Sequence, residues 1–283
     1  MDKNRIRTNT LRERKQAGEK IAALTAYDYP TARLLDEAGI EVILVGDSLA
    51  NVVLGYDTTL PVTMEEMLHH TRAVTRGVQR ALVVADMPFM SFQADPGDAI
   101  WNAGMFLKEA GAQAVKLEGA GPVLDTIAEM VAVGIPVMGH LGFTPQSSHR
   151  FGSQVIQAKT DEQAEQLLED ARALEAAGAF AVVLECVPAQ VSRLVTEQLG
   201  IPTIGIGAGP HCDGQILVFH DLVGLTQGYH LRFVKQYANL ADTIRDAVGN
   251  YVRDVRESSF PTPDHSFFME QGEFQKFARS VRR

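Results

Sequence analysis

A lysine and a carboxylate stand two positions apart in residues 114–119, whose sequence is AVKLEG. If this stretch is a β-strand, Lys116 and Glu118 point to one face and Val115 and Leu117 to the other, because side chains alternate along a strand. Burying two such charges is costly unless each is paired. A mutual salt bridge without a chemical role would meet that need, and so would a shared functional site. The neighbouring strands decide between the two.

Other short apolar runs also end in residues that could do chemistry. Carboxylates close or follow three of them, at Asp47, Asp86 and Glu185, and an imidazole closes another, at His140. Four carboxylates packed together at neutral pH repel one another, so some must be protonated or a cation must be present. Hard oxygen donors without an accompanying cysteine favour Mg²⁺, which proteins bind with one or two carboxylates plus water and substrate oxygens.

Asp47 and Asp86 are the best candidates for metal ligands because each directly follows an expected strand. Glu118 could bind the metal directly or hold a metal-bound water. A single aspartate in such a place would more simply be a helix N-cap or a turn former. Two aspartates at equivalent strand ends, with Glu118 beside them, favour the metal site.

The remaining polar residues have roles that follow from such a site. Lys116 would bind an anion such as a substrate carboxylate, since a Schiff base needs a depressed pKa that neighbouring carboxylates oppose. The Ser48 hydroxyl could bind the same carboxylate or could form only a local turn. Glu185 lies among apolar neighbours, which favours a proton acceptor, although backbone amides could also satisfy it. His140 could contact the substrate or be a buried, hydrogen-bonded histidine.

Two alternating patterns in the chain would position these residues. Apolar runs suited to strands covered on both faces occupy residues 21–26, 41–46, 81–85, 112–118, 135–139, 180–186, 203–206 and 216–218. Helical periodicity occupies residues 31–38, 64–77, 96–110, 122–133, 161–177 and 189–199. About eight such βα units favour the α/β class and a (β/α)8 TIM barrel over an open doubly wound sheet, and the active-site face of a barrel lies at the carboxyl ends of its strands.

Helix boundaries and the end of the chain can be predicted in more detail. Thr63 is a good N-cap with Glu66 completing a capping box, and Asp161 could cap the helix that follows it. We expect one barrel domain over residues 1–283, with a C-terminal helical extension over residues 240–283. Helices at 240–257 and 270–280 would pack outside the barrel or onto another subunit.

The composition restricts the classes of partner. The net charge of -9 argues against nucleic acid and acidic membrane surfaces, and no stretch is apolar for long enough to span a bilayer. Cys186 and Cys212 have no zinc-like spacing, so a reducing compartment is the simpler assumption. The highly charged residues 1–20 lack the apolar segment of a signal peptide.

The candidate residues lie in strings that together closely resemble the ketopantoate hydroxymethyltransferase family. The strings are LTAYD (24–28), VGDS (45–48), VADMPF (84–89), KLEG (116–119), GHLGFTPQ (139–146), LECVP (184–188) and IGIGAG (204–209). The resemblance is dense from about Thr25 to Leu225, which makes it far more specific than any single motif. The sequence after Asn239 is less distinctive.

The resemblance implies a (β/α)8 barrel that uses Mg²⁺ and takes a one-carbon unit from 5,10-methylenetetrahydrofolate. The acceptor would be 3-methyl-2-oxobutanoate, converted through a Mg-stabilised enolate to ketopantoate for pantothenate and coenzyme A synthesis. It implies a role for each charged residue: Asp47 and Asp86 on the metal with Glu118 close to it, Ser48 and Lys116 on the substrate carboxylate, and Glu185 as the base. It also implies a large homo-oligomer, commonly a decamer, in the cytoplasm.

Three other functions stay open on the residues alone. A Mg²⁺-dependent 2-oxo-acid lyase or mutase, such as the isocitrate lyase group, would share the acidic site but commonly uses a catalytic cysteine loop, a context that Cys186 lacks. A non-catalytic sensor or assembly barrel would have no reason to keep four crowded carboxylates. A phosphate-binding barrel could use the glycine-rich residues 205–209, although no arginine or lysine stands beside them.

Overall fold

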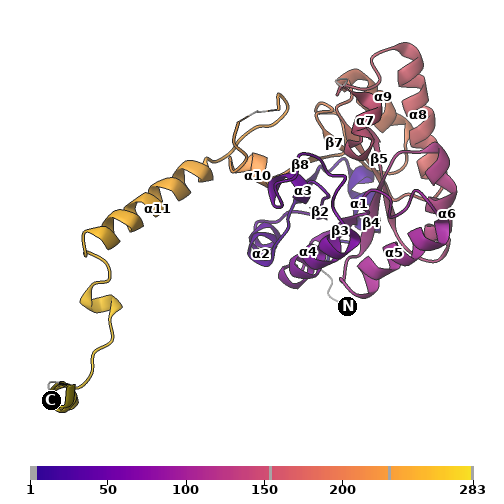
Figure 1. Ribbon diagram of the computed structural model, residues 1–283. Coiled ribbons are helices and arrows are strands. Elements are labelled where there is room, and N and C mark those ends of the chain that lie inside the picture. The colour runs from indigo at the N-terminus through magenta and orange to yellow at the C-terminus, as the bar shows by residue number, and fades with distance from the viewer. Residues whose placement is uncertain (1–4, 153–154, 229–230, 282–283) are drawn as a thin grey trace.

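The computed structural model describes residues 5–152, 155–228 and 231–281. Eight parallel strands form a closed barrel in chain order, with the last strand paired to the first (Figure 1). The strands are β1 (Ile21–Thr25), β2 (Val42–Val45), β3 (Leu82–Asp86), β4 (Ala114–Glu118), β5 (Val137–Gly142), β6 (Ala181–Glu185), β7 (Thr203–Ile206) and β8 (Gly214–Leu217). The barrel confirms the predicted fold class.

Helices follow most of the strands. They are α1 (Thr8–Ala17), α2 (Tyr29–Glu37), α3 (Leu49–Val52), α4 (Met64–Gly77), α5 (Pro96–Lys108), α6 (Leu124–Ala132), α7 (Ser148–Phe151), α8 (Asp161–Ala176), α9 (Ala189–Gln198), α10 (Phe219–Leu222), α11 (Leu240–Arg256) and α12 (Gln271–Val281), with 3-10 turns at Gly121–Val123, Pro145–Ser147 and Pro263–His265. Helix α1 differs from the others because its Leu11 packs against residues inside the barrel, such as Ile21 and Ile216. It therefore closes the amino-terminal end.

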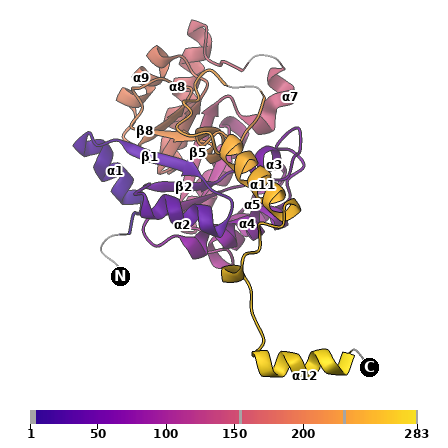
Figure 2. The ribbon, with the colours of Figure 1, turned by 90° about the vertical axis from the view of Figure 1, so that its left-hand side faces the viewer.

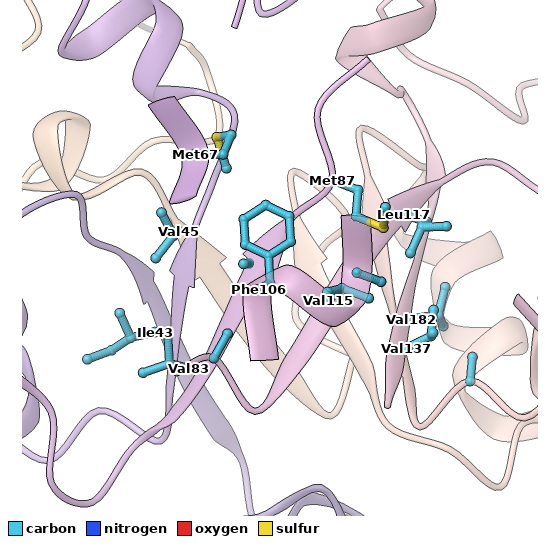
Figure 3. Packing of buried hydrophobic residues seen from close by; sticks show 14 of the residues in the cluster. Ile43, Val45, Met67, Val83, Met87, Phe106, Val115, Leu117, Val137 and Val182 are labelled. Atoms are coloured by element: carbon cyan, nitrogen blue, oxygen red, sulfur yellow. The ribbon is translucent and has the colours of Figure 1, made fainter. Parts of the chain in front are cut away.

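Side-chain alternation along the strands divides the apolar residues into two cores. Val115 and Leu117 of β4 lie in the layer between the sheet and the helices, where Phe106 of α5 also packs (Figure 3). Ala114 lies in the separate core inside the barrel. Lys116 and Glu118 share the parity of Ala114, so they also point into the barrel, as the sequence predicted.

The local predictions agree with the structure in part. Thr63 caps α4, and its capping box with Glu66 is present. The prediction for Asp161 was wrong: the N-cap of α8 is Thr160, whose Oγ1 accepts the Gln163 backbone N–H at 3.3 Å. Threonine is itself a good cap, and its extended backbone places the hydroxyl over the first turn. Asp86 is the last residue of β3 rather than the residue after it.

The regular βα alternation ends before the barrel is complete. No helix lies in residues 207–213 between β7 and β8, and β8 is followed only by the four-residue helix α10. The prediction of about eight βα units is therefore wrong at this end of the chain, where β7 is not followed by a helix. Helices α11 and α12 exist close to their predicted bounds, but they extend away from the barrel and neither has a buried residue (Figures 1 and 2).

Candidate active site

One cavity at the carboxyl ends of the strands brings the predicted site residues together. Its volume is about 130 Å³, and its lining includes Asp47, Ser48, Asp86, Lys116, Glu118, His140 and Glu185. Strand register explains the meeting, because Asp86 pairs with Lys116 across β3 and β4, and Glu118 pairs with His140 across β4 and β5. The strand-end argument thus predicted where these side chains lie.

Lys116 is the cation of this cavity. Its Nζ lies 2.8 Å from Oδ1 of Asp86, and both side chains are buried. The ion pair therefore joins neighbouring strands instead of joining Lys116 to Glu118 within β4. Burial alone would lower the pKa of Lys116, but the negative charges of Asp86, Glu118 and Asp47 raise it overall. Lys116 consequently stays protonated and can bind an anion.

Two carboxyl groups of the cavity bind protons unusually tightly. Burial, followed by the negative charges of Asp86 and Glu118, raises the pKa of Asp47 to about 8. Burial also raises the pKa of Glu118 to about 7, although the charge of Lys116 opposes the change. The crowding of carboxylates therefore has the effect expected from the sequence, since without a cation the site would hold protons near neutral pH.

The oxygen atoms available in the cavity fit a small, hard cation. Glu118 Oε1 is buried and accepts no hydrogen bond from the part of the chain that the structure describes, and Asp86 Oδ1 is buried with Lys116 as its ion-pair partner. Within that part, no three His, Cys, Asp or Glu side chains are already arranged around one metal position. A cation here would thus rely on one or two carboxylates and on oxygen atoms of water and substrate, the pattern typical of Mg²⁺.

His140 lies between the lysine and the fourth carboxylate. Its Nδ1 is 3.1 Å from Lys116 Nζ, and its Nε2 is 3.3 Å from Glu185 Oε2. Burial and the charge of Lys116 lower the pKa of His140, which keeps the ring neutral. Because an ammonium group only donates, Nδ1 accepts and the ring proton is assigned to Nε2, facing Glu185.

Glu185 is the most accessible of the four carboxylates. Its side chain is 17% exposed, whereas those of Asp86 and Glu118 are each 4% exposed. It ends β6, next to His140 of β5. A partly exposed carboxylate in this cavity can exchange protons with solvent, which suits an acid or base.

Ser48 makes a specific contact that the sequence did not predict. Its Oγ lies 2.8 Å from the hydroxyl of Tyr27, a buried residue at the start of the loop after β1. Burial raises the pKa of Tyr27, so the phenol keeps its proton. Ser48 precedes α3, but its side chain makes no capping hydrogen bond to that helix. The hydroxyl is bound to Tyr27 instead and lines the cavity.

Gln146 was also missed, although it holds two of the carboxylates. Its backbone N–H donates to Glu118 Oε2 at 2.9 Å, and its Nε2 donates to Asp47 Oδ2 at 3.0 Å. Nε2 also donates to the Met87 carbonyl at 2.9 Å, and Oε1 accepts from Gln93 at 3.1 Å. The 3-10 turn Pro145–Ser147 after β5 places Gln146 beside the carboxylates of Asp47 and Glu118.

Replacing Gln146 with leucine is expected to destabilise the protein by about 1–3 kcal/mol, because buried acceptors on Asp47 and Met87 would lose their donor. Chemical denaturation of the metal-free protein measures the change. The matched variant Gln93→Leu removes the two hydrogen bonds of an exposed residue, to Gln146 and to the Phe92 N–H, and should change stability by about 0.5 kcal/mol or less. Equal effects of the two variants would contradict the central role of Gln146.

A closed parallel barrel with crowded carboxylates, a lysine and an imidazole at its carboxyl rim defines a (β/α)8-barrel enzyme with an acidic active site. A family model described as ketopantoate hydroxymethyltransferase matches residues 5–263. The chain therefore belongs to the ketopantoate hydroxymethyltransferase family.

Relatives within this family are similar over nearly their whole length. A 3-methyl-2-oxobutanoate hydroxymethyltransferase of Carboxydothermus hydrogenoformans is 57% identical over 266 residues, covering 94% of this chain and 96% of the relative. One of Syntrophotalea carbinolica is 58% identical over 253 residues, covering 89% and 95%. The family resemblance seen in the sequence strings is thus confirmed.

Solved structures with lower sequence identity share the fold. A phosphonopyruvate hydrolase in complex with oxalate and Mg²⁺ has a TM-score of 0.58 at 16% identity, covering 98% of this chain and 97% of the other. A phosphoenolpyruvate phosphomutase from Streptomyces platensis subsp. rosaceus has a TM-score of 0.59 at 16% identity, covering 98% and 99%. At this identity the likeness concerns the barrel alone.

Proposed function

We propose that this chain transfers a hydroxymethyl group from 5,10-methylenetetrahydrofolate to 3-methyl-2-oxobutanoate, giving ketopantoate for pantothenate and coenzyme A synthesis. The observation that carries the proposal is the meeting of Lys116 with four carboxylates in one cavity of a chain from this family. A 2-oxo acid presents a carboxylate and an oxo group, which need a cationic residue and an electrophilic partner. The lyase or mutase alternative is less favoured because such proteins share only the fold.

Each residue of the cavity has a part in this reaction. Lys116 binds the substrate carboxylate, and the Ser48 hydroxyl, oriented by Tyr27, donates a further hydrogen bond to it. Glu185 removes the C3 proton of the 2-oxo acid, with His140 Nε2 orienting its carboxylate. Water adds to the methylene carbon of the donor and both of its C–N bonds break, so that tetrahydrofolate leaves and the carbon remains at the oxidation level of formaldehyde. The nucleophilic C3 then forms a bond to this carbon, and the resulting alkoxide takes up the proton that Glu185 removed.

Asp47 and Asp86 would hold Mg²⁺, with Glu118 as a third ligand or as the residue that holds a bound water. Their buried and crowded oxygen atoms support this role. When bound, the cation supplies a Lewis acid that stabilises negative charge on the 2-oxo group. Gln146 keeps the Asp47 and Glu118 carboxylates in place for this purpose.

The metal-free protein is expected to lose stability as pH rises from about 5 to about 8. The folded-state pKa values of Asp47 (about 8) and Glu118 (about 7) lie above their ordinary values of 3.8 and 4.5. The folded protein therefore holds protons that the unfolded chain has released, so rising pH favours unfolding. Mg²⁺ should raise the melting temperature more at about pH 8 than at about pH 6, because binding displaces those protons.

Thermal unfolding with a chelator and with Mg²⁺ at both pH values measures this dependence. Asp47→Asn is the matched control, since it keeps the shape but removes one titrating group and should flatten the pH profile. Stability that increases with pH through this window in the presence of chelator would contradict the prediction.

A second cavity adjoins the first and offers room for the folate donor. Its volume is about 690 Å³, and it shares Glu118 with the reaction cavity. Arg150 and Phe151 also line it. An aromatic ring can stack on a flat heterocycle, and a guanidinium group can bind a carboxylate. We assign the donor to this cavity because its shared wall would bring the one-carbon unit to the 2-oxo acid.

Replacing Phe151 with alanine is expected to weaken tetrahydrofolate binding by about tenfold through the loss of ring stacking. Calorimetric titration with tetrahydrofolate measures the loss, and affinity for 3-methyl-2-oxobutanoate with Mg²⁺ should be unchanged. Leu194→Ala, on an exposed part of α9 outside both cavities, is the control. Unchanged folate affinity of the Phe151 variant would place the donor elsewhere.

Transfer of the one-carbon unit from methylenetetrahydrofolate to 3-methyl-2-oxobutanoate, followed with and without Mg²⁺, tests the proposed function directly. Product that forms only with both folate and metal supports it, and turnover of a 2-oxo acid without folate would favour a lyase or mutase.

We further propose a homo-oligomer, commonly a decamer in this family, in the cytoplasm. The free, buried thiols of Cys186 and Cys212 are compatible with that compartment. No helix in the described ranges is long and apolar enough to cross a membrane.

A further inference from the structure

The reaction cavity has a charged half and an apolar half. Apart from Glu185 and Asp221, its charged and imidazole side chains lie in β2 to β5 or in the loops that follow these strands. Most of its apolar lining comes instead from β6 to β8 and from the chain after the barrel, at Val183, Ile206, Ile216, Leu217, Leu231 and Phe233. Glu185 stands beside the apolar set, because it pairs with Ile206 across β6 and β7. A ligand that fits both halves has one charged end and one apolar end.

The reacting groups determine which part of the acceptor reaches the apolar half. Under the proposed function, the substrate carboxylate lies on Lys116 and its C3 faces Glu185. His140 stands between these residues, with Nδ1 3.1 Å from Lys116 Nζ and Nε2 3.3 Å from Glu185 Oε2. Since C1 and C3 of a 2-oxo acid are two bonds apart, the acid can lie along the imidazole ring. Its hydrocarbon end then points past Glu185 into the apolar half.

Phe233 closes the apolar half with a partly buried ring that packs on the polypeptide backbone. A Cβ atom built on Gly207 would lie 2.8 Å from Cδ1 of Phe233 and 3.1 Å from its Cγ. Gly207 also has a φ of +63°, a backbone conformation that favours glycine. The ring therefore occupies the space that a side chain at position 207 would fill, and it cannot retreat toward the loop after β7.

The segment that carries Phe233 is attached to the chain at the end of the barrel. The Tyr237 N–H donates to the Leu222 carbonyl at 2.8 Å, and the Leu240 N–H donates to the Val223 carbonyl at 2.9 Å. Both acceptors belong to α10 or directly follow it. Backbone hydrogen bonds thus hold this segment next to β8, and the position of the Phe233 ring follows from them.

We propose that Phe233 is a specificity-determining residue that limits the length of the acceptor's side chain, an inference that rests on the proposed function. The ring stands where a side chain longer than isopropyl would continue. Phe233 also lines a third cavity of about 480 Å³, together with Gly207 and Gly209. Removing the ring joins this space to the reaction cavity and gives a longer side chain room. One methylene group in an apolar pocket changes selectivity by about 10- to 200-fold.

Exchange of the C3 protons with deuterated water, followed by proton NMR with Mg²⁺ and without folate, tests the proposal. Wild-type protein should exchange 3-methyl-2-oxobutanoate faster per proton than 4-methyl-2-oxopentanoate, which is one carbon longer. Phe233→Ala should shift the ratio of the two rates at least about tenfold toward the longer acid, and Phe233→Leu should shift it less. The intrinsic acidity of the two acids cancels, because the same pair is compared in every protein. Phe267→Ala, at a fully exposed side chain, is the matched control and should keep the wild-type ratio.

An unchanged ratio in Phe233→Ala, or an equal loss of exchange for both acids, would overturn the role of Phe233 in selectivity. A wild-type protein that exchanges both acids equally well would overturn it too. If the wild type exchanges neither acid, the proposed function itself is refuted, so the two failures can be told apart. Circular dichroism checks folding, and if Phe233→Ala does not fold, the ratio in Phe233→Leu decides. Calorimetric titration of both acids with Mg²⁺ should show the same shift in the ratio of affinities.

Discussion

Replacing Glu185 with glutamine is expected to slow exchange of the substrate C3 proton with solvent deuterium by about 100- to 10,000-fold, the range associated with a general base. Glutamine has the same shape as glutamate but cannot accept this proton. Glu185 is more exposed than Asp86 and Glu118, its Oε2 lies 3.3 Å from His140 Nε2, and Lys116 is paired with Asp86 instead. The loss should therefore concern proton removal and leave the binding of Mg²⁺ and substrate intact.

Proton NMR of 3-methyl-2-oxobutanoate in deuterated water, with Mg²⁺ and without folate, measures this step in isolation. Calorimetric titration of the same variant separates catalysis from binding. Glu197→Gln, at an exposed ion pair on α9, is the matched control and should exchange the proton normally. Wild-type exchange rates in the Glu185 variant would remove this residue as the base and would direct attention to His140.

The charged part of the site was predictable because each of its members lies in or just after the carboxyl-terminal part of a barrel strand. Apolar runs in the sequence located the strands, and the first charged residue at each end then identified Asp47, Asp86, Lys116 and Glu118. Alternation along a strand is a strict geometric rule, so even the shared direction of Lys116 and Glu118 followed from their spacing. The ion pair between Lys116 and Asp86 did not, because it depends on the register between strands.

Neutral residues of the site gave no comparable signal. Gln146 acts from a loop turn, and Tyr27 follows a strand without carrying a charge, so a search for charged strand ends passes over both. Their role is to donate or share hydrogen bonds with groups far away in sequence, such as Asp47 and Ser48. Both residues lie inside strings that carry the family resemblance, Tyr27 in LTAYD and Gln146 in GHLGFTPQ, and this was the available indication.

The C-terminal part of the chain shows a different limit of prediction. The sequence predicted a helix at residues 240–257, and α11 is present at Leu240–Arg256. The exposure of Ala22 on β1 and of Gln215 on β8 could be recognised only from the closed barrel, because exposure of a strand residue depends on which helices surround it.

The double variant Asp47→Ala with Asp86→Ala is expected to abolish the Mg²⁺ dependence of 3-methyl-2-oxobutanoate binding. In the wild type, Mg²⁺ should strengthen binding by at least about 100-fold, since chelation of the oxo and carboxylate oxygens requires the cation. Both aspartates are buried beside Lys116, so their removal takes away the negative charge that would hold a divalent ion there. Calorimetric titration with Mg²⁺ and with chelator gives both affinities.

Folding must be separated from metal binding in this experiment, and the asparagine pair does so. In the wild type, Asp47 Oδ2 accepts a hydrogen bond from the Gln146 amide, and Asp86 Oδ2 accepts one from the backbone N–H of Asp47, each at 3.0 Å. The variant Asp47→Asn with Asp86→Asn keeps an acceptor for both donors. It also removes the Asp47 carboxyl, whose pKa is raised by burial and by the charges of Asp86 and Glu118, but it takes from Lys116 its ion-pair partner. Circular dichroism therefore has to show that the asparagine pair is folded before its binding is compared. A well-folded asparagine pair that still binds the 2-oxo acid more tightly with Mg²⁺ would refute these two residues as the metal ligands. Loss of the Mg²⁺ effect in both pairs, with Asp125→Asn on the exposed start of α6 unchanged, would place the cation at the rim between β2 and β3.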